Sequence, residues 1–120
     1  MFVFWSSSKA PDDLLMNSNR ITQLNNLLKQ EPDDAFLQHA LALEYFSMQN
    51  YVEAKQIFFK LLQKNPDYLP SYYQLGQTLE KLSERENAAE IYRKGMDVAD
   101  VQKKIKTRSE LEQALWLLED

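Results

Sequence analysis

The sequence predicts an all-α protein, a short array of antiparallel helix pairs, and three observations support that fold class. Along most of the 120-residue chain, apolar residues recur every three to four positions, which is the spacing of one helix face. This apolar pattern repeats itself at an offset of 34 residues. Only two glycines and four prolines interrupt the chain, so it contains short turns and little loop.

The repeat is clearest at small and large apolar positions. At the 34-residue offset, Leu41 aligns with Leu75 and Ala54 aligns with Ala88. Chance rarely produces many size-matched apolar pairs at one offset, so we infer two full copies of one unit. Further aligned pairs are Ala42 and Gly76, Phe58 and Tyr92, Leu24 and Phe58, Leu27 and Leu61, and Pro32 and Pro66.

The first expected element is a single helix over residues 19–30, which aligns with the second helix of each later pair and lacks a partner upstream. Residues 1–16 match no part of the repeat, so we expect a disordered or loosely packed extension, with Met16 as a candidate alternative start. The apolar run at the N-terminus is too short for a secretory signal. No stretch reaches the roughly 18 apolar residues of a membrane span, and we therefore expect a cytoplasmic protein.

The first complete pair is predicted as helices over 34–48 and 50–64. Apolar residues of the first helix form one stripe. The second helix opens at Asn50-x-x-Glu53, which resembles a capping box, and a turn containing Pro66 ends it. The stripe of the first helix consists of Ala35, Leu37, Leu41, Ala42 and Tyr45.

The second pair is predicted over 68–82 and 84–100. Pro70 falls in the first turn of a helix, where its missing N–H costs little. Ser83-x-x-Glu86 is a capping box for the following helix.

A last helix is predicted from the capping box Thr107-x-x-Glu110 through Leu118. Trp116 and Leu117 lie to the side of its apolar face. We expect this helix to cap the array. Its apolar face consists of Leu111, Ala114, Leu115 and Leu118.

This pattern resembles the tetratricopeptide repeat, a 34-residue helix–turn–helix unit written W-x2-L-G-x2-Y, A-x3-F and P. The first copy reads Gln38-x2-Leu41-Ala42-x2-Tyr45, Ala54-x3-Phe58 and Pro66. The second copy reads Tyr72-x2-Leu75-Gly76-x2-Leu79 and Ala88-x3-Tyr92, and it has Asp100 in place of the proline. We therefore expect its second helix to continue beyond the usual stop.

The resemblance implies a short right-handed α-solenoid. The expected units are an extension over 1–16, a half repeat over 17–32, full copies over 33–66 and 67–100, and a turn with a capping helix over 101–120.

In this family, the first helices of successive pairs line a concave groove that holds an extended peptide or a partner's helix. Phe36 and Tyr73 are better candidates for the groove than Leu43 and Phe46, because the adjacent Leu37 and Tyr72 already supply the packing face. Core packing is the competing interpretation for each position, above all for Leu43 and for Phe46. The partner-binding positions carried over are Phe36, His39, Leu43, Tyr73, Gln77 and Glu80, with Phe46 and Pro70 as further inner-face positions.

One subclass of the family binds the terminal carboxylate of chaperones with Lys, Asn, Asn, Lys and Arg. Lys104 and Arg108 match the last two positions. His39, Leu43 and Gln74 fall at the first three positions. Ser109 and Glu110 lie where a third copy needs leucine and a small residue, so the third repeat frame is broken and we do not expect this clamp.

Catalytic, cofactor and metal sites are not expected. The chain has no cysteine and a single histidine, His39, which excludes thiolate nucleophiles and any site with two imidazoles. Acidic residues outnumber basic ones by 18 to 14, and broad nucleic-acid binding needs a basic stripe that is missing here. The one basic run, Lys103 to Arg108, is expected to be a solvated turn. We expect neither a nucleic-acid nor a membrane partner.

Two non-catalytic functions remain. The first is an adaptor that binds a protein or peptide in the groove. The second is a structural, weakly homodimeric module, because a lone helix over 19–30 leaves apolar residues to be covered. The cover is either residues 1–15, with Phe2, Phe4 and Trp5, or a second subunit. Further candidate contacts are the runs Leu14-Leu15 and Trp116-Leu117-Leu118.

Overall fold

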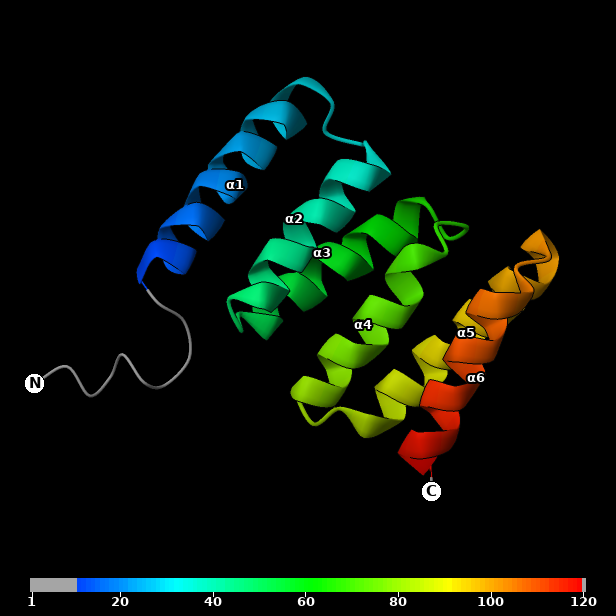
Figure 1. Cartoon of the computed structure of the whole chain (residues 1–120). Coiled ribbons are helices and arrows are strands. Elements are labelled where there is room, and N and C mark those ends of the chain that lie inside the picture. The colour runs from blue at the N-terminus through cyan, green and yellow to red at the C-terminus, as the bar shows by residue number, and fades with distance from the viewer. Residues whose placement is uncertain (1–10, 120) are drawn as a thin grey trace, which may run out of the picture.

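The computed structural model describes residues 11–119, which form six α-helices joined by short turns and contain no strand (Figure 1). The expected extension lies largely outside the described residues. The fold is all-α, as predicted, and it is a right-handed solenoid of antiparallel helix pairs. The helices are α1 (Pro11–Gln30), α2 (Ala35–Ser47), α3 (Tyr51–Lys64), α4 (Pro70–Lys81), α5 (Arg85–Gln102) and α6 (Ile105–Glu119).

The helices form two layers. In Figure 1, α2, α4 and α6 lie side by side in front, and α3 and α5 lie behind them. Each helix packs against its neighbour in the chain, and α1 packs against α2. Because α2, α4 and α6 share one layer, α6 occupies the place of a third first helix. None of the helices in residues 11–119 has a stretch that is long and apolar enough to cross a membrane.

Local sequence explains most helix starts. The Asp34 side chain accepts a hydrogen bond from the Leu37 N–H at 2.9 Å, which caps α2. The Asn50 side chain accepts one from the Glu53 N–H at 3.4 Å, so the cap predicted for α3 is confirmed. Pro70 is the first residue of α4, as expected.

The cap predicted at Ser83 is wrong. Ser83 has a φ of 62° and lies in the turn, and α5 begins at Arg85 after Glu84, which makes no side-chain cap bond. Gln49 occupies the equivalent place in the first copy with a φ of 64°. Each turn inside a pair therefore requires a left-handed residue, and this requirement takes Ser83 out of the capping position.

Three other helix ends differ from or extend the prediction. The first helix begins at Pro11 and not at Asn19, because proline is well tolerated at a first helical position. α5 runs to Gln102, which confirms that it continues past the usual stop. α6 begins at Ile105, so Thr107 lies inside its first turn and is not the cap.

The core is one continuous layer between the two helix layers, and it contains most of the apolar motif positions of both copies. Two glycines allow the closest approaches. A Cβ on Gly76 would overlap the ring of Tyr92, and a Cβ on Gly95 would lie 2.7 Å from the Cβ of Tyr72. Side chains with no exposure include Ala42, Ala54, Phe58, Leu61, Leu75, Leu79, Ala88, Tyr92 and Leu111.

The burial pattern of α6 explains why it does not follow the 34-residue frame. Leu75 and Leu79 are buried on α4, whereas on α6 the buried Leu111 and half-buried Leu115 take these roles. The offset between Leu75 and Leu111 is 36 residues, so the pattern on α6 is displaced by two. Leu118 is also buried and is therefore not available as a dimer contact.

Candidate functional site

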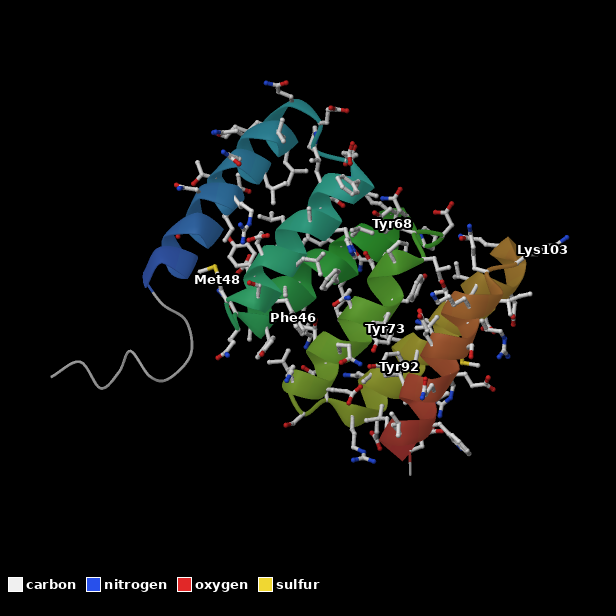
Figure 2. All side chains as sticks on the ribbon, viewed as in Figure 1. Phe46, Met48, Tyr68, Tyr73, Tyr92 and Lys103 are labelled. Carbon is white, nitrogen blue, oxygen red and sulfur yellow. The ribbon has the colours of Figure 1, made fainter. Side chains whose placement is uncertain are left out.

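A cavity of about 550 Å3 lies between α4 and α6, in the layer formed by α2, α4 and α6. We call it the α4–α6 groove. Figure 2 shows Tyr73 on α4 with Tyr92 next to it, on the side of α4 that faces α5 and α6. The groove is lined by Tyr73, Gln77 and Glu80 from α4 and by Glu110, Gln113, Ala114 and Leu117 from α6.

The structure brings three of the six predicted partner-binding residues together in this groove. Tyr73, Gln77 and Glu80 are one helical turn apart on α4, so their side chains share one face. Tyr73 remains 37% exposed. These three positions were carried over from the repeat, whereas the α6 side of the groove was not predicted, because α6 departs from the repeat frame.

A hydrogen-bonded chain fixes two of these side chains. The amide Nε2 of Gln77 donates to the Tyr92 hydroxyl at 2.7 Å, and that hydroxyl donates to Glu80 Oε2 at 2.5 Å. The rings of Tyr73 and Tyr92 lie 6.2 Å apart between centroids. Tyr92 has no exposed surface and does not line the groove, but its hydroxyl bonds to Gln77 and Glu80 and holds Glu80 in one orientation.

Burial raises the pKa of the Tyr92 hydroxyl well above its ordinary value, and the hydrogen bond to Glu80 and the charge of Glu80 raise it further. The hydroxyl therefore remains a donor throughout the physiological pH range. Sequence reasoning placed Tyr92 in the core and did not assign it a role in the groove. The available signal was the hydroxyl itself, because Phe58 holds the same motif position in the first copy without one.

The groove is acidic. Glu80 and Glu110 are its only charged lining residues. Among residues 18–119, neither carboxylate has a Lys or Arg partner within ion-pair distance, whereas Glu84 pairs with Lys55 at 2.6 Å. Glu80 Oε2 accepts the Tyr92 bond, and its other oxygen is available to a ligand. The groove can therefore accept hydrogen bonds from a cation and contact apolar groups through Tyr73 and Leu117.

His39 lies in the joint between α2 and α4. Its Nδ1 is 2.8 Å from the Oγ of Ser71, a residue with no exposure. Its ring contacts Phe58 and Tyr68, with centroids 5.7 Å and 5.6 Å apart. Burial lowers the pKa of His39 below its ordinary value of 6.5. These contacts make His39 a bridge between the two repeats.

The other predicted positions of the first copy lie outside the α4–α6 groove. Phe36 is 67% exposed near the start of α2. Leu43 is half-buried and packs against the core. The ring of Phe46 packs edge-on against Tyr51, with centroids 5.2 Å apart. Only Phe36 therefore offers a wide open surface on this helix.

Of the two residues that matched the carboxylate clamp, Arg108 forms ion pairs within its own chain. Arg108 Nε donates to Asp100 Oδ1 at 2.7 Å, and its Nη1 donates to Glu112 Oε1 at 3.3 Å. Arg108 therefore neutralises carboxylates of its own chain. Within the described part of the chain, no group of three or more His, Cys, Asp and Glu residues could hold a metal ion.

Comparison with solved structures places this arrangement among known proteins. The solution structure of a tetratricopeptide repeat domain protein from Salinibacter ruber is 35% identical, with a TM-score of 0.70 over 73% of this chain and 89% of that chain. A protein from Bordetella parapertussis is 23% identical, with a TM-score of 0.73 over 82% and 86%. The Sgt2 TPR domain from Aspergillus fumigatus is 18% identical, with a TM-score of 0.64 over 91% and 85%. These last two show the fold alone.

A search of curated proteins gave no match. The sequence profile described as tetratricopeptide repeat matches residues 15–99, which is more than half of the chain. Repeat proteins of this kind generally act as protein-interaction modules, through concave surfaces made by stacked repeats. The chain belongs to the tetratricopeptide repeat family.

Proposed function

We propose that this chain is a non-catalytic adaptor that binds an extended peptide or a partner's helix in the α4–α6 groove. The single observation that supports this function most strongly is the 550 Å3 cavity in which Tyr73, Gln77 and Glu80 are assembled. The exposed ring of Phe36 extends the binding surface along α2. His39 and Leu43 contribute to the shape of the surface through packing.

The lining of the groove favours a partner segment that carries a lysine or an arginine flanked by apolar residues. A cationic side chain would form charge-assisted hydrogen bonds with Glu80 and Glu110, neither of which has a cationic partner among residues 18–119. The same cation would lie within reach of the Tyr73 ring, which attracts positive charge through its face. Leu117 is 71% exposed and offers a contact for an apolar neighbour.

Selection of peptides tests this function and requires no identified partner. A phage-displayed library of random peptides is selected on the immobilised protein, and the enriched peptide is synthesised and titrated by fluorescence anisotropy. We expect enrichment of Lys or Arg next to apolar residues. Tyr73→Ala should weaken binding about tenfold, which corresponds to roughly 1.4 kcal/mol.

Val52→Ala is the matched control, because Val52 is 56% exposed on α3, in the other helix layer. Its affinity should equal that of the unchanged protein. A peptide that binds both variants and the unchanged protein equally would refute the groove as the binding surface. Acidic peptides among the enriched clones would refute the assigned partner chemistry alone.

The second candidate function, self-association, rests on different residues and does not require the groove. The observation that favours it is a set of exposed apolar side chains on α6, described next.

A further inference from the structure

Exposed apolar side chains are concentrated at the C-terminal end of the protein. Among the described residues, four of the five most exposed large apolar side chains are Val101 and Ile105 at 82%, Trp116 at 78% and Leu117 at 71%. All four lie within the last turn of α5 or on α6. Exposed apolar side chains often mark interaction surfaces. Leu117 lines the α4–α6 groove and Val101 lies on α5, so Ile105 and Trp116 are the two that remain on the rest of α6.

Ile105 and Trp116 share one side of α6. They are 11 residues apart, about three helical turns, so they lie in line along the helix at a distance of about 16 Å. Ser109 and Glu112 lie between them on the same line, and we call these four residues the outer face of α6. The opposite side carries Leu111, which is fully buried.

The outer face is open to a partner. Within the described residues, α6 packs mainly against α5 (Figure 1), and Ile105 and Trp116 remain exposed. A hollow of about 510 Å3 lies beside Trp116, lined by Ser109, Glu112, Gln113 and Trp116. Its volume can accept an apolar side chain from another molecule.

Basic and acidic residues occupy opposite ends of the segment over residues 103–119. Every charged residue from Lys103 to Arg108 is basic, and every charged residue from Ser109 to Glu119 is acidic. This order opposes the dipole of α6, whose positive end is its N-terminus. By contrast, α3 has an acidic residue in its first turn and a basic residue in its last turn. The charge order of α6 therefore does not serve the stability of its own helix.

We propose that a second copy of this chain docks on the outer face of α6, with the two α6 helices antiparallel about a two-fold axis between Ser109 and Glu112. The basic residues from Lys103 to Lys106 of each copy then lie opposite the acidic half of the other α6, which a parallel arrangement would prevent. In that acidic half, Glu119 also pairs with Arg93 of its own chain. Ile105 of each copy packs against Trp116 of the other and fills the hollow beside it. The small Ser109 faces Glu112, whose charge is offset by Arg108 at 3.3 Å.

The proposed dimer leaves the α4–α6 groove accessible. Ala114 and Leu117 line the groove from a side of α6 that is turned away from Ile105 and Trp116, and Gln113 alone borders both the groove and the hollow beside Trp116. A dimer would therefore present two grooves, and the proposal stands even if the groove binds nothing.

Sedimentation equilibrium of the full chain tests the proposal, from about 10 µM to about 500 µM, since self-association depends on concentration. The mass of the unchanged protein should rise from 14.1 kDa towards twice that value. Trp116→Lys and Ile105→Glu should each raise the dissociation constant at least about tenfold. Phe36→Lys is the matched control, because Phe36 is similarly exposed but lies on α2, and it should leave dimerisation unchanged.

Combining Trp116→Lys with Ile105→Glu in one chain tests the orientation. In the antiparallel pair, the new glutamate at position 105 of each copy lies opposite the new lysine at position 116 of the other. The double variant should therefore recover dimerisation, most strongly at low salt. Lys104→Glu should weaken the dimer. It should not lower the melting temperature, because an acidic residue at the N-terminus of a helix stabilises that helix.

Circular dichroism verifies that every variant is folded. A strictly monomeric unchanged protein at about 500 µM, or a dimer indifferent to Trp116→Lys, would overturn the proposal. Failure of the double variant to recover dimerisation would overturn the antiparallel arrangement.

Discussion

The joint between α2 and α4 and the joint between α4 and α6 are made by equivalent helices, yet they differ in what fills them. At the first joint, His39 bonds to the buried Ser71 and packs against two aromatic rings. At the second joint, Tyr73 holds the equivalent repeat position, lies on the surface and borders a cavity of about 550 Å3. The same motif position thus serves as a bridge in one copy and as a groove wall in the other.

The difference arises from the next helix across each joint. α4 presents Ser71, a small hydroxyl residue that forms a hydrogen bond with the imidazole of His39. α6 is displaced by two residues from the repeat frame, and it presents Glu110 and Gln113 towards Tyr73. A repeat position therefore acquires its role from its neighbour as much as from its own side chain.

The largest expected effect is at the first joint. Phe58 has no exposed surface and packs against His39, so Phe58→Ala removes a large ring from the core. We expect a loss of about 3–5 kcal/mol in the free energy of unfolding, measured by urea denaturation. A loss below about 1 kcal/mol would contradict the assigned packing.

Gly76→Ala tests the close packing beneath the second joint. A Cβ at this position would overlap the ring of Tyr92, which is fully buried. The overlap should outweigh the better helix propensity of alanine, giving a net loss of about 1–3 kcal/mol. An unchanged or increased melting temperature would mean that Tyr92 can be displaced without cost.

Tyr92→Phe tests the role of the Tyr92 hydroxyl in the groove separately from the role of its ring in the core. The ring stays in place, while the hydroxyl that links Gln77 to Glu80 is lost. Stability should fall by about 1 kcal/mol, because both former partners are only half-buried and regain water. The free energy of binding a peptide selected on the groove should weaken by more than the free energy of unfolding does, because Glu80 loses its fixed orientation. Equal peptide affinity before and after the change would argue against an oriented Glu80.

The smallest effect concerns pH at the first joint. Burial lowers the pKa of His39 below 6.5, so the unfolded chain takes up a proton more readily than the folded protein. Its contribution to stability is complete above pH 6.5 and is lost as the pH falls, with a slope of at most about 1.4 kcal/mol per pH unit. His39→Gln can retain a bond to Ser71 and does not titrate. Between pH 7.5 and 5.5, the free energy of unfolding from denaturation curves should therefore change less with pH in this variant than in the unchanged protein.

Much of the fold could be predicted from the sequence, because the repeat constrains packing. Leu41, Ala54, Phe58 and Leu75 are apolar positions that align at the 34-residue offset, and all four are buried. The prediction at Ser83 failed because a capping motif is a local signal, whereas the left-handed turn is required by the geometry of the helix pair.

The candidate site was only partly predictable. Tyr73, Gln77 and Glu80 followed from their repeat positions, and the cavity contains all three. The bond between His39 and Ser71 joins residues 32 apart in the sequence, and no local pattern indicates it. The groove residues on α6 were not predicted, because the repeat frame ends before this helix.

The most direct test of the account is the location of a bound peptide by nuclear magnetic resonance. Uniformly 15N-labelled protein is titrated with the peptide selected on it, and shifts of the backbone amides are followed. We predict the largest shifts at Tyr73, Gln77, Gln113 and Leu117, with small shifts at His39. Largest shifts on α2 around His39, or on α1, would contradict the claim that the second joint is the open binding surface.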